Sequence, residues 1–304
     1  MITAEALTKR YGTTTAVDGL SFTAGPGAVT GFLGPNGAGK STTMLLVLGL
    51  ERPTAGTVTV DGRRYADLPS PLRTVGAMLD ARSVHPGRTA FRHLLGLART
   101  HGIPRSRVEE VIGLTGLEAV AGQRVRTFSL GMGQRLGIAG ALLGDPGTLV
   151  LDEPVNGLDP DGVLWVRDLV RGLAAEGRTV FLSSHLMHEL ALCADRVVVL
   201  GRGRLLADAS VRDLLERSAG AGLVRVRTTE PDVLARSLVR LGAEVAPQPD
   251  GVLHVRGIGA EEVGAAAGRD GVTVLELAAE TGSLEAAYLE LTTGSVQYRA
   301  GGAR

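Results

Sequence analysis

The sequence predicts an α/β fold built on a parallel sheet, followed by a smaller α+β domain. Short apolar runs such as Ala28–Leu33 and Thr148–Leu151 have the length of buried strands. Helical stretches, among them the amphipathic segment Gly162–Glu176, separate these runs along the first ~215 residues. Strands that alternate with helices are typical of a parallel sheet covered by helices on both faces.

The expected elements of this first part follow from the same two patterns, apolar runs for strands and longer periodic stretches for helices. A helical region at 89–144, interrupted at Gly102 and Pro104, is expected to form a helical subdomain over about 81–144. In chain order we expect strand 28–33, helix 39–50, strand 57–60, the helical region, strand 148–151, helix 162–176, and strands 179–182 and 196–200.

A run of small residues at 218–222 predicts a linker, after which the pattern restarts. Beyond it we expect strands at 223–229, 252–257 and 272–277 and helices at 231–241, 260–267 and 283–291. This order suits a small α+β domain of ferredoxin-like type. The sequence therefore predicts a first domain at 1–217, a linker at 218–222 and an accessory domain at 223–304.

Composition narrows the class of protein. The 304 residues are 44% apolar and 21% charged, as in a soluble globular protein, and the net charge is zero. A zero balance argues against a protein that binds nucleic acid through bulk positive charge. No apolar run approaches the ~20 residues of a membrane-spanning helix, and Met1–Tyr11 does not have the pattern of a signal peptide. We expect a cytoplasmic chain, and any membrane span must come from another chain.

The strongest motif follows the first apolar strand and opens a helix. It fits the phosphate-loop pattern G-x-x-x-x-G-K-[ST] at every fixed position. Glycines let backbone N–H groups converge on phosphate oxygens, and the helix adds its positive end. Lys40 is predicted to reach the β- and γ-phosphates of a nucleotide and Ser41 to ligate Mg²⁺. The expected nucleotide-binding residues here are Gly34, Pro35, Asn36, Gly37, Ala38, Gly39, Lys40, Ser41 and Thr42.

The presence of the phosphate loop suggests roles for two further segments. Asp152 and Glu153 follow the apolar strand 148–151, where Asp152 could hold the metal and Glu153 could deprotonate an attacking water. The segment Ser129–Arg135 opens an apolar helical run. It can be interpreted as a simple helix cap at Ser129 or as a second phosphate-binding helix start.

Together these motifs resemble the nucleotide-binding subunits of ATP-binding cassette transporters, over about residues 2–215. The segment Ser129-Leu130-Gly131-Met132-Gly133-Gln134-Arg135 is similar to the signature motif of that family. The resemblance implies an α/β ATPase cassette that uses ATP and Mg²⁺. Further residues match the family's nucleotide site: the signature residues Ser129, Gly131 and Gly133, Asp159 in the D-loop, the switch His185 as a catalytic residue beside Glu153, and Tyr11 as the aromatic that stacks on adenine.

One position departs from the family pattern. Asp80 follows the segment Val75–Leu79, where the family usually has Gln at the γ-phosphate sensor. A carboxylate can ligate Mg²⁺ but cannot donate a hydrogen bond as Gln can. We therefore place Asp80 with Ser41 and Asp152 in the expected metal site.

The resemblance also implies partners. Cassettes of this family pair head-to-tail, as homodimers or with a related chain, and energise a separately encoded permease at the inner face of the plasma membrane. The motif wording, Asp80 and the segment 294–299 resemble drug or antibiotic exporter subunits of actinobacteria. Two alternatives stay open, an importer subunit and a soluble cassette ATPase acting on ribosomes or DNA. The single cassette, the zero net charge and the lack of a heptad run between Ser41 and Ser129 weigh against the second.

Overall fold

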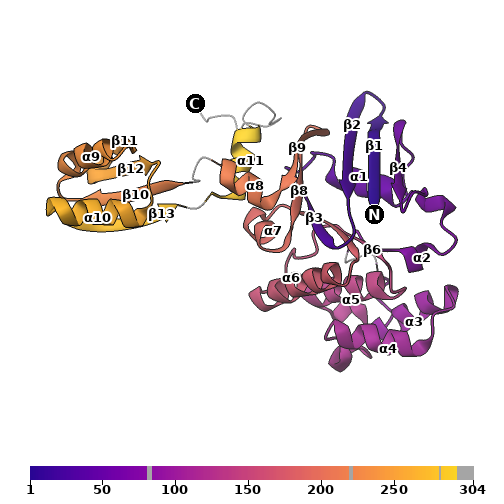
Figure 1. Ribbon diagram of the computed structural model, residues 1–304. Coiled ribbons are helices and arrows are strands. Elements are labelled where there is room, and N and C mark those ends of the chain that lie inside the picture. Colours follow the sequence, from indigo (N-terminus) through magenta and orange to yellow (C-terminus); the bar gives the residue numbers. More distant parts are fainter. Residues whose placement is uncertain (81–83, 219–221, 281, 293–304) are drawn as a thin grey trace, which may run out of the picture. The chain divides into compact units, whose positions relative to one another are not determined.

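The computed structural model describes residues 1–80, 84–218, 222–280 and 282–292, which form two compact units (Figure 1). The first unit is Met1–Ser210 with Thr292, and the second is Val211–Leu291. Most of the predicted linker, 219–221, lies outside the described residues, as does the whole of the segment 294–299.

The main sheet of the first unit has six strands in the order β5-β6-β7-β3-β8-β9. Its first five strands are parallel, and β9 pairs with β8 antiparallel, so the predicted parallel sheet is confirmed. The central strands are buried on both faces, which explains why they read as continuous apolar runs. The strands are β3 (Ala28–Leu33), β5 (Val75–Met78), β6 (Thr148–Leu151), β7 (Thr179–Ser184), β8 (Arg196–Gly201) and β9 (Arg204–Ser210).

A second, antiparallel sheet was predicted only in part. It contains β1 (Ile2–Tyr11), β2 (Thr14–Ala24) and β4 (Ala55–Val60), in the order β2-β1-β4. Only β4 was predicted from the sequence, because register shifts along β1 break the alternation of apolar and polar residues. The two sheets share one core, in which the rings of Phe22, Phe32 and Phe181 have centroids 5.0–5.6 Å apart.

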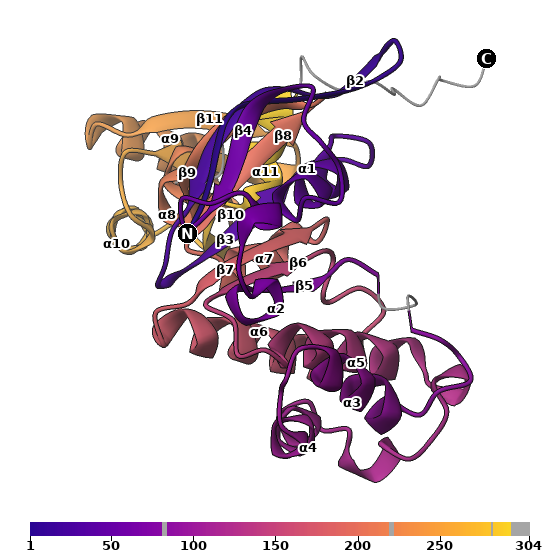
Figure 2. The ribbon, with the colours of Figure 1, turned by 90° about the vertical axis from the view of Figure 1, so that its right-hand side faces the viewer.

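Helices cover the main sheet and form a separate group beyond its β5 edge. Figure 2 shows α3, α4 and α5 together at that end. They lie within the range 81–144 expected for a helical subdomain, of which residues 81–83 lie outside the described residues. The helices are α1 (Lys40–Val47), α2 (Pro71–Thr74), α3 (Ala90–Thr100), α4 (Arg105–Leu114), α5 (Leu130–Leu142), α6 (Pro160–Ala175) and α7 (Met187–Cys193). Short 3-10 turns occur at Tyr65–Asp67, Glu118–Val120 and Val125–Thr127.

The second unit is built around a four-stranded antiparallel sheet in the order β11-β12-β10-β13. Its βαββαβ sequence of elements is the ferredoxin-like arrangement. One strand, β11, was not predicted, because it is mostly exposed and contains a proline. The elements are α8 (Val211–Arg217), β10 (Leu223–Thr228), α9 (Pro231–Arg240), β11 (Glu244–Gln248), a 3-10 turn (Pro249–Gly251), β12 (Val252–Arg256), α10 (Ala260–Asp270), β13 (Val274–Glu280) and α11 (Leu284–Thr292).

Helix α8 lies in the second unit, whereas the sequence analysis placed residues 211–217 at the end of the first domain. The reason is a close approach of two backbones within the second unit. A Cβ added at Gly282, just before α11, would lie 1.9 Å from the carbonyl oxygen of Leu215. The turn before α11 is therefore fitted directly against α8.

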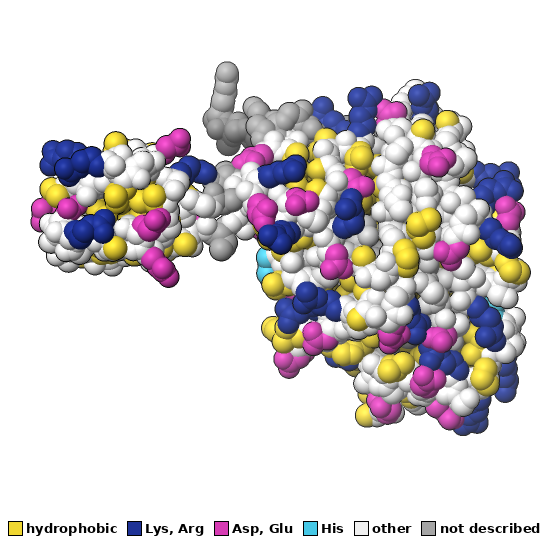
Figure 3. Space-filling view, in the orientation of Figure 1, with side chains coloured by type: hydrophobic (Ala, Val, Ile, Leu, Met, Phe, Trp, Pro, Cys, Tyr) yellow, Lys and Arg dark blue, Asp and Glu magenta, His cyan; other side chains and the backbone are white. Residues whose placement is uncertain are grey.

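Charge is mixed over the surface that Figure 3 presents. Basic and acidic side chains alternate there without a large region of one sign, in keeping with the zero net charge. Among the described residues, no helix is both long enough and apolar enough to span a bilayer.

Candidate functional site

The predicted phosphate loop lies at the rim of an open cavity of about 450 Å³, where β3 ends and α1 begins. Ten of the predicted site residues line this cavity, together with Ala16 and Leu79. The ten are Tyr11, Pro35, Asn36, Gly37, Gly39, Lys40, Ser41, Thr42, Asp152 and Glu153. The cavity therefore joins residues from three parts of the chain that the sequence analysis assigned to one nucleotide site.

The backbone of the loop requires glycine where the sequence has it. Gly39 has φ +102°, and a Cβ there would lie 2.5 Å from the carbonyl oxygen of Ala16. Gly39 also precedes α1, which has neither a capping side chain nor an acidic residue in its first turn. The first N–H groups of α1 and its positive end are thus left for an anionic ligand, which fits a nucleotide phosphate.

Lys40 is folded back onto the loop. Its ammonium donates hydrogen bonds to the carbonyl oxygens of Gly34 (2.6 Å) and Pro35 (3.4 Å), and the side chain is buried. Burial lowers the pKa of Lys40 from its usual range, and the carboxylates of Glu153 and Asp152 oppose that shift. Gly34 and Ala38, the two predicted loop residues that are not among those lining the cavity, are both buried.

The expected metal ligands Ser41 and Asp152 are in contact. The Ser41 hydroxyl donates to Asp152 Oδ2 at 2.8 Å, and the Asp152 N–H donates to the Met78 carbonyl oxygen at 2.8 Å. A hydroxyl and a carboxylate at the rim of a phosphate cavity fit Mg²⁺, which takes few protein oxygens and keeps waters and phosphate oxygens. Among the described residues, no group of three or more His, Cys, Asp or Glu side chains could hold a metal by itself.

Glu153 and His185 meet across the ends of β6 and β7. The Glu153 Oε2 atom lies 2.7 Å from His185 Nδ1 and accepts the His185 backbone N–H at 3.3 Å. Glu153 has φ +50°, a left-handed conformation that non-glycine residues rarely adopt. Its carboxylate also lines the cavity, so it can face a ligand there while His185 holds it from outside.

Tyr11 ends a strand of the antiparallel sheet, whereas Asp80 follows β5, an edge strand of the main sheet. Tyr11 ends β1, lines the cavity and has the Lys9 ammonium 4.8 Å from its ring centroid, with Lys9 also paired to Glu51 at 2.6 Å. Asp80 is exposed and comes two residues after β5, and its neighbour Leu79 lines the cavity. Tyr11 thus belongs to the cavity wall, whereas Asp80 is the neighbour in sequence of a residue of that wall.

The signature residues form a different surface. Ser129 and Gly133 line a pocket of about 280 Å³ with Leu130 and Phe128, and none of the residues described as lining the phosphate-loop cavity belongs to this segment. Ser129 Oγ accepts the Met132 N–H at 3.2 Å, so it does cap α5, which was one of the two interpretations of this segment.

The start of α5 is interlocked with the turn that follows Glu153. A Cβ at Gly157 would lie 2.1 Å from Leu130 Cδ2, and a Cβ at Gly131 would lie 3.2 Å from Leu158 Cδ2. Asp159 ends this turn by accepting the Gly162 N–H at 2.9 Å, which caps α6. The signature helix and the D-loop turn are therefore one packed unit.

Two polar residues at the site were missed by the sequence analysis. Gln134 Nε2 donates to the carbonyl oxygens of Glu153 (3.4 Å) and Asn156 (3.1 Å), which fastens α5 to the turn. Ser183 contacts both Asp152 and Glu153. Gln134 lay within a segment already singled out, whereas Ser183 is marked only by its place at the end of an apolar strand.

Comparison with known proteins decides the family. A family model described as ABC transporter matches residues 17–156. An uncharacterized ABC transporter ATP-binding protein of Bacillus subtilis, YhcH, is 40% identical over 210 residues, which are 68% of this chain and 69% of the relative. The chain belongs to the ATP-binding proteins of ABC transporters. It is an ATPase cassette that binds ATP, uses Mg²⁺ and serves transport, and the resemblance stated from the motifs is confirmed.

Other relatives of this ABC protein have named substrates. The bacitracin transport ATP-binding protein BcrA of Bacillus licheniformis is 40% identical over 70% of each chain. The Nod factor export ATP-binding protein I of Ralstonia nicotianae is 35% identical over 81% of this chain and 78% of its own. A second family model, a domain of unknown function (DUF8746), matches residues 222–285.

Solved structures agree on the fold of the cassette. An ATP-binding subunit of an ABC transporter superposes with a TM-score of 0.65 at 27% identity, covering 70% of this chain and 91% of its own. A dimeric cassette in a post-hydrolysis state, bound to ADP and Pi, has a TM-score of 0.64 at 25% identity and covers 70% of this chain and 99% of its own.

Proposed function

We propose that this ABC protein pairs head-to-tail with a second cassette and powers a separately encoded exporter permease for a drug, antibiotic or lipid-like compound. The relatives named for bacitracin transport and Nod factor export support the direction and the class of cargo. The chain works at the inner face of the membrane, and its second unit, Val211–Leu291, is an accessory domain.

The observation that carries the pairing is the separation of the two nucleotide-binding surfaces. Lys40 and Asp152 line one cavity, whereas Ser129 and Gly133 line another. In the paired form, the signature surface of one copy closes the phosphate-loop cavity of the other. Donors that stabilise the charge of the transferred phosphoryl group then come partly from the partner, so an isolated monomer is a poor ATPase.

Within each cavity the residues have distinct roles. Lys40 and the N–H groups of the loop bind the β- and γ-phosphates, and the ring of Tyr11 stacks on the base. Ser41, Asp152 and Asp80 hold Mg²⁺, which supplies positive charge to the phosphate oxygens when bound. Glu153 accepts a proton from the attacking water, and His185, 2.7 Å away, fixes its carboxylate and contacts the γ-phosphate.

Pairing is tested with the Glu153→Gln variant, which should bind ATP without consuming it. Gel filtration with light scattering should show a dimer with ATP and Mg²⁺ and a monomer with ADP. The matched control, Lys40→Ala in the same background, should stay monomeric in both, because it lacks the phosphate contact. A monomer under all conditions would remove the composite site.

The permease contact is supported by a basic groove on the helical subdomain. Arg88, Arg92, Arg105 and Arg124 surround Phe91 in a hollow of about 680 Å³. Arg105 pairs with Glu109 at 2.9 Å, whereas the described part of the chain provides no ion pair for the other three arginines. Unpaired guanidinium groups around an aromatic ring suit an acidic cytoplasmic segment of the permease.

Affinity purification of the tagged chain from detergent-solubilised membranes, with mass spectrometry, tests this contact. A multi-spanning protein should co-purify in near-equal amount and should be lost from the Arg88→Glu, Arg92→Glu variant. The control is Arg171→Glu, an exposed arginine on α6, which should retain the partner. Recovery of ribosomal proteins or DNA-repair factors instead would overturn the transport role, and an importer permease would overturn the direction.

A further inference from the structure

Ser183 is a buried hydroxyl at the carboxyl end of β7 that belongs to none of the predicted motifs. Leu151 of β6 pairs with Leu182 of β7. The residues that come next in the chain, Asp152 and Ser183, therefore lie side by side. The Ser183 side chain is fully buried, and a buried hydroxyl is costly unless it is hydrogen-bonded. The hydrogen-bond partners of the Ser183 hydroxyl therefore indicate what this residue does.

Ser183 Oγ bonds to both acids of the site. It donates to Asp152 Oδ1, and the same oxygen accepts the backbone N–H of Glu153 at 2.9 Å. Glu153 has the unusual φ of +50°, so a hydrogen bond to its N–H helps to hold a conformation that the residue would not adopt readily. One hydroxyl thus fixes the side chain of one acid and the backbone of the other.

The Asp152 carboxylate is held on both oxygens. Ser41 donates to Oδ2 and Ser183 to Oδ1, so the carboxylate cannot rotate without breaking one of the two bonds. The neighbouring Ser184 does a different job, since its hydroxyl donates to the Leu186 carbonyl oxygen (3.3 Å) and accepts the Leu186 N–H (3.0 Å). Ser184 shapes the turn that carries His185, and of these two serines it is Ser183 that contacts the acids.

We propose that Ser183 is a positioning residue of the hydrolytic site, which orients Asp152 toward the metal and fixes the backbone that presents Glu153 to water. The inference rests on the proposed roles of these two acids. It predicts that loss of the hydroxyl weakens metal binding and turnover, while nucleotide binding without metal stays the same, because Ser183 does not line the phosphate-loop cavity.

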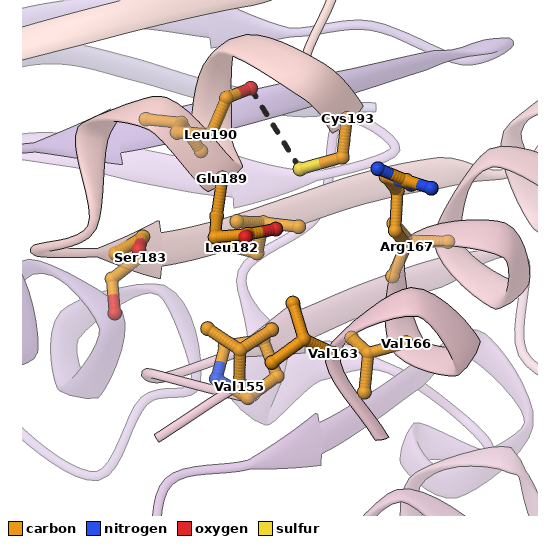
Figure 4. A pocket seen from close by; sticks show the side chains of 12 residues that line it. Val155, Val163, Val166, Arg167, Leu182, Ser183, Glu189, Leu190 and Cys193 are labelled. Carbon is orange, nitrogen blue, oxygen red and sulfur yellow. Dashed lines mark hydrogen bonds between the residues drawn. The ribbon is translucent and has the colours of Figure 1, made fainter. Parts of the chain in front are cut away.

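The test compares Ser183→Ala, Ser183→Thr and Thr179→Val in the full chain. Thr179 is a matched control, since it lies on the same strand, is buried and has a hydroxyl without a hydrogen-bond partner among the described residues. Ser183→Thr keeps the hydroxyl. Its added methyl group can use the apolar cavity of about 20 Å³ that Ser183 lines with Val155, Leu182 and Cys193 (Figure 4).

Metal binding is read with Mn²⁺ in the presence of saturating ADP, by electron paramagnetic resonance of the free ion. Ser183→Ala should weaken Mn²⁺ binding and lower kcat by about 10- to 100-fold, the usual effect of losing a group that orients a metal ligand. ADP binding without metal and the KM for ATP should change little. Ser183→Thr should restore most of the Mn²⁺ affinity, and Thr179→Val should match the wild type.

The outcomes separate the inference from the proposed function. Wild-type Mn²⁺ affinity and kcat in Ser183→Ala, or equal losses in Thr179→Val, would overturn the role of Ser183 while leaving the ATPase intact. A wild-type chain that binds no Mn²⁺ with ADP would overturn the proposed metal site as well. If Ser183→Ala does not fold, Ser183→Cys offers a weaker hydrogen bond at similar volume, and the same comparisons apply.

Discussion

The contact of α7 with β3 allows a stability prediction whose size follows from the structure. Leu190 of α7 is fully buried, and a Cβ added at Gly31 of β3 would lie 2.6 Å from Leu190 Cδ1 and 2.8 Å from its Cγ. Leucine and glycine are thus fitted to each other as a knob and a hole. Because α7 begins two residues after His185, this contact also holds the helix that follows His185.

Each single change should destabilise the first unit, for a different reason. Leu190→Ala leaves a cavity and should cost about 3 kcal/mol, near the lower end of the range for buried leucines, because the short α7 can move inward. Gly31→Ala overpacks the same place and should cost about 2 kcal/mol.

The double variant should be much less damaged than the two losses together imply. The methyl group added at Gly31 occupies part of the space left by the Leu190 side chain. We therefore expect the pair to cost about 3 kcal/mol, which is a coupling of about 2 kcal/mol between contacting residues.

Urea unfolding followed by Trp165 fluorescence measures these changes. Trp165 is the single tryptophan of the chain and lies in α6, so its signal reports on the first unit. The control is Gly172→Ala, a helical glycine with open space around it, which should stabilise by about 0.5–1 kcal/mol. Additive losses in the double variant would refute the knob-and-hole packing.

Three further predictions concern single side chains. Burial raises the pKa of Cys193 to about 11 from an ordinary 9.0, so at pH 8 iodoacetamide should alkylate the native chain about 100-fold more slowly than the urea-unfolded chain, and equal rates would contradict this. Ser129→Ala removes the cap of α5 and should cost about 1 kcal/mol in urea unfolding; it should also weaken ATP-dependent pairing, with ADP binding unchanged as the control. Tyr11→Ala should weaken ATP binding about tenfold by calorimetry, consistent with an aromatic stacking contact, whereas Tyr11→Phe should not; equal affinities would remove the stacking role.

Much of the cassette could be predicted because its signals are local. The phosphate loop is one continuous segment, and β6 has the bounds predicted for it, 148–151, because a fully buried strand is an unbroken apolar run. The sheet of β1, β2 and β4 was harder, since β1 carries register shifts and mixes exposed with buried residues. An irregular antiparallel strand has no period that a single sequence reveals.

The site residues Ser183 and Gln134 were not predicted for a different reason. Ser183 acts on Asp152, which is 31 residues earlier in the chain, and the contact exists only because β6 and β7 are neighbours in register. Gln134 likewise acts on carbonyl oxygens of the turn after Glu153. Residues that act through partners on other strands leave no spacing pattern in the sequence, whereas residues that contact a phosphate together do.

Because the strand order is β6-β7-β3, the site residues that follow these strands lie at the same edge of the main sheet, with β7 in the middle. On one side of β7 lie the two acids after β6, and on the other lies the phosphate loop after β3. Ser183 lies at the end of β7 and is hydrogen-bonded to both acids, whereas Leu190 packs the helix that follows His185 against Gly31 of β3. Their variants should therefore differ: Ser183→Ala should change metal affinity with little loss of stability, and Leu190→Ala should change stability with little loss of metal affinity. If both variants lowered metal affinity equally, the end of β7 would respond as one rigid piece, and a separate positioning role for the Ser183 hydroxyl would have to be given up.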